Sequence, residues 1–306
     1  MGTIVTQAYK AIENIVGSRY ISDDPAIMQG YKSGPGGYEA GLGYERVMTV
    51  LPAAVALPKD ADELQRIVKI CARYNVPYVP YATGFYGPKT HCHVDDELII
   101  DMKRMQYFNW DEKHMFADIG PGIIYSSLQQ EAFNKGCYGV IGGGGAQCSA
   151  IANLLGDGWS PISLKIGLPH RRILGTELVL PDGELVKMGS LATSDDPFWG
   201  EGPGPDLRGI LRGFTGLRGC MGTVTRMAVK YMPLIQDCPK PQGVAPNTSL
   251  ALDERRIRWI NFQVPTKANQ VQAMYEIGAA EICAACTKVP VFWRAIAKAE
   301  DKEEFW

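Results

Sequence analysis

Several features that would indicate particular classes of protein are absent from this sequence. No run of about 18 apolar residues occurs, so no transmembrane helix is predicted. The first residues carry Lys10 and Glu13 and lack the unbroken apolar stretch of a signal peptide. The 31 lysines and arginines are balanced by 33 aspartates and glutamates, and the formal charge is −2. This balance provides no basic field for nucleic acid and no polybasic membrane anchor.

The sequence also lacks the cysteine and histidine patterns of disulfide scaffolds and metal sites. Eight cysteines in 306 residues, without the spacing of a disulfide scaffold, favour a reduced, cytoplasmic setting. His91 and His93 form a His-x-His pair, but no second pair of ligands accompanies it, so no metal site is predicted. The two common phosphate-binding fingerprints, G-x-G-x-x-G after a strand and G-x-x-x-x-G-K-S/T, do not occur.

Glycine, in contrast, is abundant and clustered. The 34 glycines gather at 34–43, 84–87, 142–145, 156–158 and 200–222. Such clusters indicate backbone that adopts positive φ or approaches another group closely. The clusters at 84–87 and 142–145 follow short apolar segments, where loops can point successive N–H groups at an anion. Tight turns between strands are the alternative.

The remaining pattern predicts a mixed α+β chain without regular βαβ alternation. A helix is predicted at 61–74, with Asp60 and Glu63 as a capping box, and another at 126–135, with Ser126 as cap and Gly136 as stop. A third helix is predicted at about 266–280. Strands are predicted at 48–57, 76–81, 97–102, 115–120, 221–231 and 257–264, with 97–102 paired to 115–120, and a hairpin at 173–188.

Six segments occur in an order that resembles a known family. They are 55–87, 97–105, 118–128, the glycine loop 142–161, 173–185 and 205–233. Together they resemble the FAD-binding domain of the vanillyl-alcohol oxidase and p-cresol methylhydroxylase (PCMH-type) flavoprotein superfamily, which includes glycolate oxidase and D-lactate dehydrogenase flavin subunits. The resemblance implies an α+β fold of two subdomains at 46–235. A lead-in at 1–45, a Pro-rich linker at 236–249 and a partial cap domain at 250–306 complete the expected organisation.

The resemblance also implies which residues bind FAD. The expected pyrophosphate loop is Thr83, Gly84, Phe85, Tyr86 and Gly87, and the Pro-Gly turn beside the cofactor is Pro121 and Gly122. The second loop is Gly143, Gly144, Gln147, Cys148 and Ser149, and the remaining contacts are Ile173, Gly222, Thr223 and Val224.

The implied activity is oxidation of an alcohol, hydroxy acid or alkylphenol by hydride transfer to flavin N5. FAD is expected to be noncovalent, although loop histidines tether flavin in some relatives. The alternatives are an electron-transferring flavin subunit of a complex and a non-catalytic FAD-binding scaffold. The substrate and the electron acceptor are not identified by the sequence.

No catalytic residue is assigned. Asp157 is shifted from the acidic position of phenol-oxidising relatives, and Leu154 and Leu155 stand before the Gly-x-Gly run. Cys283 and Cys286 form a C-x-x-C, for which a helical core pair and a redox pair are both considered. The segment by which the family chain returns to the flavin domain is missing from this sequence. A longer chain or a second subunit, in a homo- or hetero-oligomer, is therefore expected to complete the cap.

Overall fold

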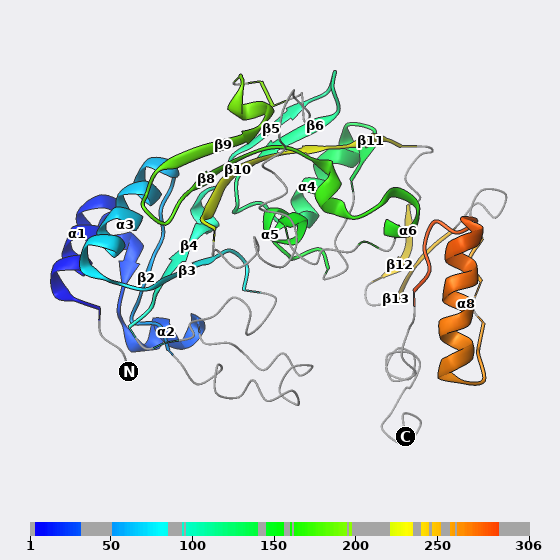
Figure 1. Ribbon diagram of the computed structural model, residues 1–306, viewed down its shortest axis with the longest axis horizontal. Helices are drawn as coiled ribbons and strands as arrows, with labels where there is room; N and C mark the ends of the chain where they lie inside the picture. The colour runs from blue at the N-terminus through cyan, green and yellow to red at the C-terminus, as the bar shows by residue number, and fades with distance from the viewer. Residues whose placement is uncertain are drawn as a thin grey trace. The chain divides into compact units, whose positions relative to one another are not determined.

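The protein has two compact units in a computed structural model (Figure 1). The first comprises residues 1–159 and 169–238, and the second comprises 160–168 and 239–306. The structure describes residues 4–31, 51–84, 94, 96–139, 145–155, 160, 162–194, 196–197, 221–234, 240–244, 247–251, 258–260 and 262–287. The domain boundaries given above stay predictions.

The elements follow one another as short helices and strands. The helices are α1 (Thr6–Val16), α2 (Pro25–Tyr31), α3 (Ala61–Tyr74), α4 (Tyr125–Asn134), α5 (Ala150–Leu155), α6 (Ser163–Ile166) and α8 (Lys267–Ala280). The strands are β1 (Ile21–Ser22), β2 (Ala54–Ala56), β3 (Tyr78–Tyr81), β4 (Leu98–Asp101), β5 (Phe108–Asp111), β6 (Phe116–Ile119), β7 (Cys137–Tyr138), β8 (Ile173–Val179), β9 (Leu185–Gly189), β10 (Thr223–Lys230), β11 (Met232–Pro233), β12 (Pro241–Val244) and β13 (Asn247–Leu250).

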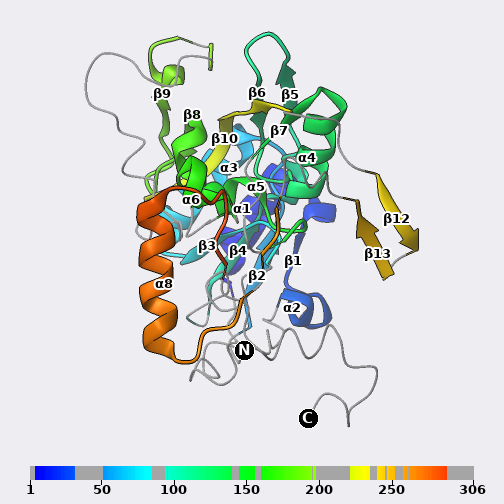
Figure 2. The ribbon, with the colours of Figure 1, turned by 90° about the vertical axis from the view of Figure 1, so that its right-hand side faces the viewer.

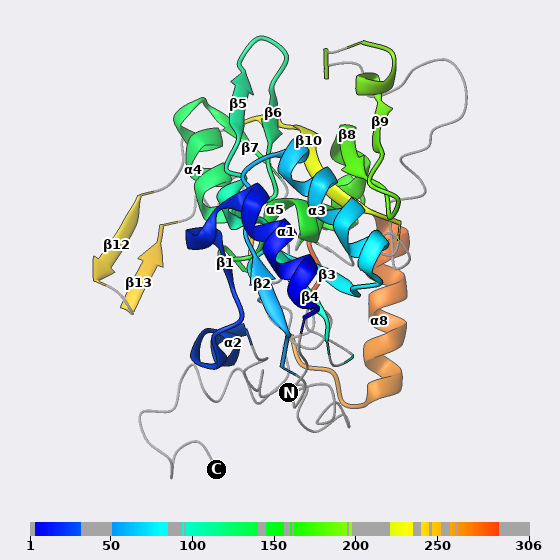
Figure 3. The ribbon, with the colours of Figure 1, turned by 90° about the vertical axis from the view of Figure 1, so that its left-hand side faces the viewer.

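The first unit contains two subdomains, each built on one sheet. The first sheet has the order β1-β2-β4-β3, in which β2 and β3 run parallel to β4. Helices α1 and α3 cover one face of it, where Leu64, Ile67 and Ile100 are fully buried (Figure 3). Helix α2 lies on the other face, and its Met28 packs against Ile99. Parallel strands joined by a crossover helix place their carboxyl ends at one edge of the sheet.

The second sheet is antiparallel, with the order β5-β6-β10-β8-β9. Helices α4 and α5 pack on one face of it and bury Leu128 and Leu154 against Ile119 and Met227 (Figure 2). Two α+β subdomains of this kind confirm the predicted fold class.

Helix α3 forms as its local sequence predicts. Asp60 caps it by accepting a hydrogen bond from the Glu63 amide at 2.9 Å, and Asn75 ends it in the left-handed conformation. The Glu63 carboxylate accepts from the Lys59 amide at 2.9 Å, one residue before the cap itself. The apolar stripe then packs against the first sheet, which confirms the predicted helix.

The predicted start of α4 is wrong. Ser126 lies inside the helix, and Ile124 takes the cap position without a side-chain hydrogen bond. The amides of Tyr125 and Ser126 instead donate to the carbonyls of Cys148 and Ala146. A backbone segment about twenty residues further along therefore does the work expected of a serine side chain. Gly136, with φ of +65°, follows the helix as predicted.

Strand pairing is predicted only in part. The hairpin of β8 and β9 and the long strand β10 are confirmed. The pairing of 97–102 with 115–120 is wrong, because β4 pairs with β2 and β3, whereas β6 pairs with β5 and β10. Residues 258–260 and 262–264 are not in a strand, so the one predicted there is also wrong.

The second unit is described by itself. It contains the hairpin of β12 and β13, within the segment predicted to be a linker, and helix α8. Thr266 caps α8 by accepting from the Asn269 amide at 3.1 Å. None of the α8 side chains is buried, and Trp259 and Tyr275 are 76% and 75% exposed. The predicted helix is confirmed, but within the described residues its apolar side chains are uncovered.

Candidate cofactor site

The first glycine loop leaves the carboxyl end of β3 through Thr83 and Gly84. Gly84 has φ of +64°, in the left-handed region that side chains disfavour. A Cβ at this position would lie 1.9 Å from the hydroxyl oxygen of Tyr81. Two independent constraints, the dihedral angle and the tyrosine packed against the backbone, therefore require glycine here.

Three of the predicted loops meet at Ser149. The Ser149 amide donates to the Thr83 hydroxyl at 3.3 Å, across 66 residues of sequence. The Ser149 hydroxyl donates to the Pro121 carbonyl at 3.3 Å, and Ser149 also forms a bridge with Ile124. Only 3% of Ser149 is exposed. The pyrophosphate loop, the Pro-Gly turn and the second glycine loop, predicted as separate segments, are thus joined in one place.

The Pro-Gly turn needs its glycines for packing. The amides of Gly120 and Gly122 donate to the carbonyls of Tyr107 and Met105 at 2.8 and 3.0 Å. A Cβ on Gly120 would lie 2.4 Å from the Met105 oxygen, and one on Gly122 would lie 2.8 Å from the Lys103 oxygen. These two amides are bonded to a neighbouring backbone segment of the same chain, so they are not available to an anion.

Helix α4 fastens both ends of the second glycine loop. Beyond the two amide bonds to Cys148 and Ala146, the Gln129 side-chain oxygen accepts from the Gly139 amide at 3.4 Å. Because the amides of its first turn are already used, the amino terminus of α4 has few donors left for a phosphate, in contrast to helices that bind anions directly.

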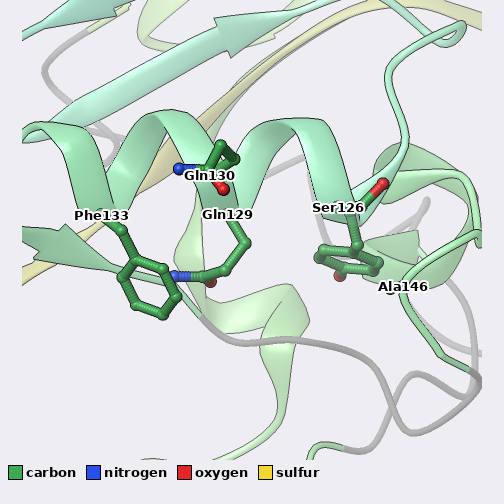
Figure 4. A pocket seen from close by; sticks show the side chains of 6 residues that line it. Ser126, Gln129, Gln130, Phe133 and Ala146 are labelled. Atoms are coloured by element: carbon green, nitrogen blue, oxygen red, sulfur yellow. The ribbon is translucent and has the colours of Figure 1, made fainter. Parts of the chain in front are cut away.

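A hollow of about 170 Å³ lies along α4 (Figure 4). It is lined by Tyr125, Ser126, Gln129, Gln130, Phe133 and Ala146. It is smaller than ligand pockets, which span about 300–1,000 Å³. We therefore place the candidate cofactor site at the meeting point of the loops, and not in this hollow.

The predicted contacts on β10 and β8 differ in character. The Thr223 hydroxyl is buried and has no hydrogen-bond partner among the described residues. A buried hydroxyl without a partner is costly, so it fits a ligand that supplies one. Gly222, with φ of +135°, would place a Cβ 2.5 Å from the Val179 oxygen. Ile173 and Val224 pack in the core of the second subdomain.

The second loop is described from Gly145 onward. Gln147 is exposed, whereas Cys148 is buried, and burial raises the pKa of its thiol. The predicted residues Phe85, Tyr86, Gly87, Gly143 and Gly144 lie outside the described residues, as do Asp157, His91 and His93.

A polar cluster near Gly84 was not predicted from the sequence. The Tyr31 hydroxyl donates to the Asp101 carboxylate at 2.7 Å, and the Lys103 ammonium lies 2.7 Å from the same oxygen. Asp101 is fully buried. Burial, followed by the bond to Asp101, raises the pKa of Tyr31 far above its ordinary value. The one available sign was a carboxylate at the end of the apolar strand 97–102.

A second buried ion pair lies on the antiparallel sheet. The Arg226 guanidinium donates to both oxygens of Asp118, with Nε 3.0 Å from Oδ1 and Nη2 2.5 Å from Oδ2. Asp118 is 1% exposed. The hydrogen bond to Asp118 raises the pKa of Arg226. The pair joins β6 to β10 and is explained by sheet structure.

Among the described residues, the histidine and cysteine motifs form no metal site. His114 contacts Asp111 at 3.0 Å in the turn between β5 and β6. Cys283 and Cys286 follow the end of α8, are partly exposed and carry free thiols, which excludes the alternative of a helical core pair. In the part of the chain that the structure describes, no three metal-ligating side chains come together.

The fold and the joined loops are similar to those of FAD-binding domains. Residues 52–189 match the family model described as FAD binding domain, which confirms the resemblance seen in the sequence. The fold is similar to that of p-cresol methylhydroxylase with substrate bound, with a TM-score of 0.60 at 18% identity, over 76% of this chain and 44% of that chain. At this identity the likeness concerns the fold alone.

Two curated relatives are similar in sequence. Glycolate oxidase subunit GlcD of Bacillus subtilis (strain 168) is 29% identical over 185 residues, which is 60% of this chain and 37% of that protein. A mitochondrial D-lactate dehydrogenase (cytochrome) of Arabidopsis thaliana is 26% identical over 235 residues, 69% of this chain and 39% of that protein. The chain therefore spans less than two fifths of the length of either relative. Among the described helices, none has the length and hydropathy to cross a membrane.

Proposed function

We propose that this chain binds one FAD noncovalently and belongs to an FAD-dependent oxidoreductase that oxidises a small hydroxy acid. The observation that carries the proposal is the junction at Ser149, where three loops expected to contact FAD are joined by hydrogen bonds. When bound, FAD would supply the hydride acceptor for oxidation of an alcohol carbon. The residues that would hold it are Thr83 and Gly84 at the diphosphate, with Ser149 as the junction that fixes these loops and Thr223 as a further contact.

The substrate class is supported by the two relatives. Their names specify glycolate and D-lactate, which are both 2-hydroxy acids. Other alcohols and alkylphenols are the wider class. An electron-transferring flavin subunit, or a scaffold that binds FAD without turnover, remains the competing proposal.

The absorption spectrum of the purified chain, followed by anaerobic substrate addition, tests the proposal. We expect a flavin spectrum, release of the yellow cofactor into the supernatant on acid precipitation, and bleaching by a 2-hydroxy acid. A colourless chain that cannot be reconstituted with FAD would refute the whole proposal. Flavin retained on the precipitated polypeptide would refute noncovalent binding. A bound flavin that substrates bleach only after a partner is added would favour the electron-transferring subunit.

We also propose that further polypeptide completes the cap, as part of a longer chain or as a second subunit. The support is the exposure of Trp259, Phe262 and Tyr275, large apolar side chains that are 76%, 59% and 75% exposed. Light scattering combined with turnover assays tests this. A stable monomer that oxidises substrate at ordinary rates would contradict it.

A cytoplasmic location is proposed on the chemistry of the cysteines. The thiols of Cys71, Cys137, Cys148, Cys283 and Cys286 are free, as is usual where the surroundings are reducing. Fractionation of the native cells, followed by immunoblotting, would test the location.

A further inference from the structure

A connected set of side chains leads from α2 to the first glycine loop. At its far end, the buried Asp101 carboxylate receives three donors: the Tyr31 hydroxyl at 2.7 Å, the Lys103 ammonium at 2.7 Å and the Lys103 amide at 3.0 Å. Asp101 is the last residue of β4 and is directly opposite Tyr81 of β3 in the parallel register. A fully buried carboxylate needs such donors, because an unpaired charge in the interior is costly.

The Tyr31 ring carries the contact onward to Tyr81. Their ring centroids lie 5.3 Å apart with an interplanar angle of 66°, an edge-to-face arrangement that aromatic pairs favour. Because the Tyr31 hydroxyl is bonded to Asp101, this bond helps to hold the ring against Tyr81. Lys103 lies 5.2 Å from the centre of the Tyr31 ring and 3.4 Å from its hydroxyl, which limits the ring further.

Tyr81 in turn lies against Gly84. Three atoms at the hydroxyl end of its ring come within 2.8 Å of the point where a Gly84 Cβ would stand. The neighbouring Thr83 hydroxyl accepts a hydrogen bond from the Ser149 amide. The turn after β3 is therefore held from one side by a tyrosine and from the other by the second glycine loop.

We propose that Tyr31 is a positioning residue for the diphosphate subsite of the FAD site. It holds Tyr81 against Gly84 through its bond to Asp101, and so keeps the Gly84 backbone in its left-handed turn. Tyr31 lies in α2, before the matched residues 52–189, so the lead-in takes part in cofactor binding although it need not contact the cofactor. This inference rests on the proposed FAD site and adds the residue that acts through it.

The test compares FAD with riboflavin, which shares the isoalloxazine and ribityl chain but has no diphosphate. Tyr31→Phe removes the hydroxyl and keeps the ring. We expect the FAD dissociation constant of the full chain to rise about tenfold, since a bond to a charged group is lost. The riboflavin constant should be unchanged. Tyr9→Phe is the matched control, because it removes a hydroxyl from a half-buried tyrosine that packs against the opposite face of the same sheet.

A second variant separates positioning from general stability. Tyr81→Phe keeps the bond between Tyr31 and Asp101 and removes the hydroxyl beside Gly84, so it also covers the case in which Tyr31→Phe does not fold. If both residues act along one path, the double variant should bind FAD no more weakly than the weaker single variant, whereas independent effects would multiply.

The outcomes separate the inference from the proposed function. A wild-type chain that fails to bind FAD overturns both. A wild-type chain that binds FAD, with Tyr31→Phe binding it equally well, overturns the inference alone. Equal weakening of FAD and riboflavin, or multiplying effects in the double variant, also overturns it, because the change would then not act through the diphosphate turn.

Discussion

The substitution Gly84→Ala tests the diphosphate turn most directly. Its Cβ would meet the Tyr81 hydroxyl oxygen at 1.9 Å, and φ of +64° would have to be kept by a residue with a side chain. The left-handed conformation costs an alanine about 1–2 kcal/mol. Displacing Tyr81 from Tyr31 forfeits about 0.5–1.5 kcal/mol of aromatic contact. We expect the loop of the variant to relax when FAD is absent and to return to the strained turn when FAD binds. The dihedral cost and the lost aromatic contact therefore both lower the FAD affinity.

Together these costs come to about 1.5–3.5 kcal/mol, which corresponds to FAD affinity about 10- to 300-fold weaker. Titration of the apo chain with FAD, followed by flavin fluorescence, measures this ratio. Gly30→Ala is the control, since a Cβ there meets nothing within 4 Å and Gly30 lies inside helix α2. In a Tyr81→Ala background only the dihedral strain remains, so the effect of Gly84→Ala should fall to about 5- to 30-fold. Equal FAD affinity of wild type and Gly84→Ala would refute the assignment of this turn to the cofactor.

The remaining predictions concern the loop junction and the two cores. Thr83→Val removes the acceptor of the Ser149 amide and should weaken FAD binding several-fold, by about 0.5–1.5 kcal/mol, whereas Thr83→Ser should retain it. Burial raises the pKa of the Cys71 thiol from 9.0 to about 12, so between these two pH values the folded state binds more protons than the unfolded state. The free energy of unfolding should therefore fall by up to about 1.4 kcal/mol per pH unit between pH 9 and about pH 12. Urea titrations of Cys71→Ala should show a shallower decline, and an equal slope would contradict this. Arg226→Met leaves the Asp118 carboxylate buried without its partner and should lower the free energy of unfolding by about 3–5 kcal/mol. Adding Asp118→Asn to this variant should recover part of the loss, and thermal melts that show no recovery would count against the prediction.

The elements that could be predicted from sequence are those fixed by neighbours in the chain. Helix α3 has its cap at Asp60 and its apolar stripe within one segment, and it forms over the predicted residues. The start of α4 depends on carbonyls at Ala146 and Cys148, so the local choice of Ser126 as cap failed. The same limit applies to strand pairing, since the partner of β6 depends on how the whole antiparallel sheet closes.

In the candidate site, too, only the features that are local in the sequence could be predicted. The glycine loops could be predicted as segments because the glycine clusters and their order can be read directly from the sequence. Their junction was not visible, because the bond between Thr83 and Ser149 spans 66 residues, and the bond between Tyr31 and Asp101 spans 70. Nothing in the spacing of these residues indicates that they meet.

Glycine alone does not identify an anion-binding loop. A better criterion is whether the backbone amides of the loop already donate hydrogen bonds to the protein. Gly120 and Gly122 lie beside the junction, yet their amides donate to the carbonyls of Tyr107 and Met105. The amides that begin α4 are used in the same way. A diphosphate needs several free N–H donors at once, because each of its oxygens loses water on binding. The amides of Gly120, Gly122 and the start of α4 are therefore not these donors, and our proposal gives that role to the loop that begins at Thr83 and Gly84.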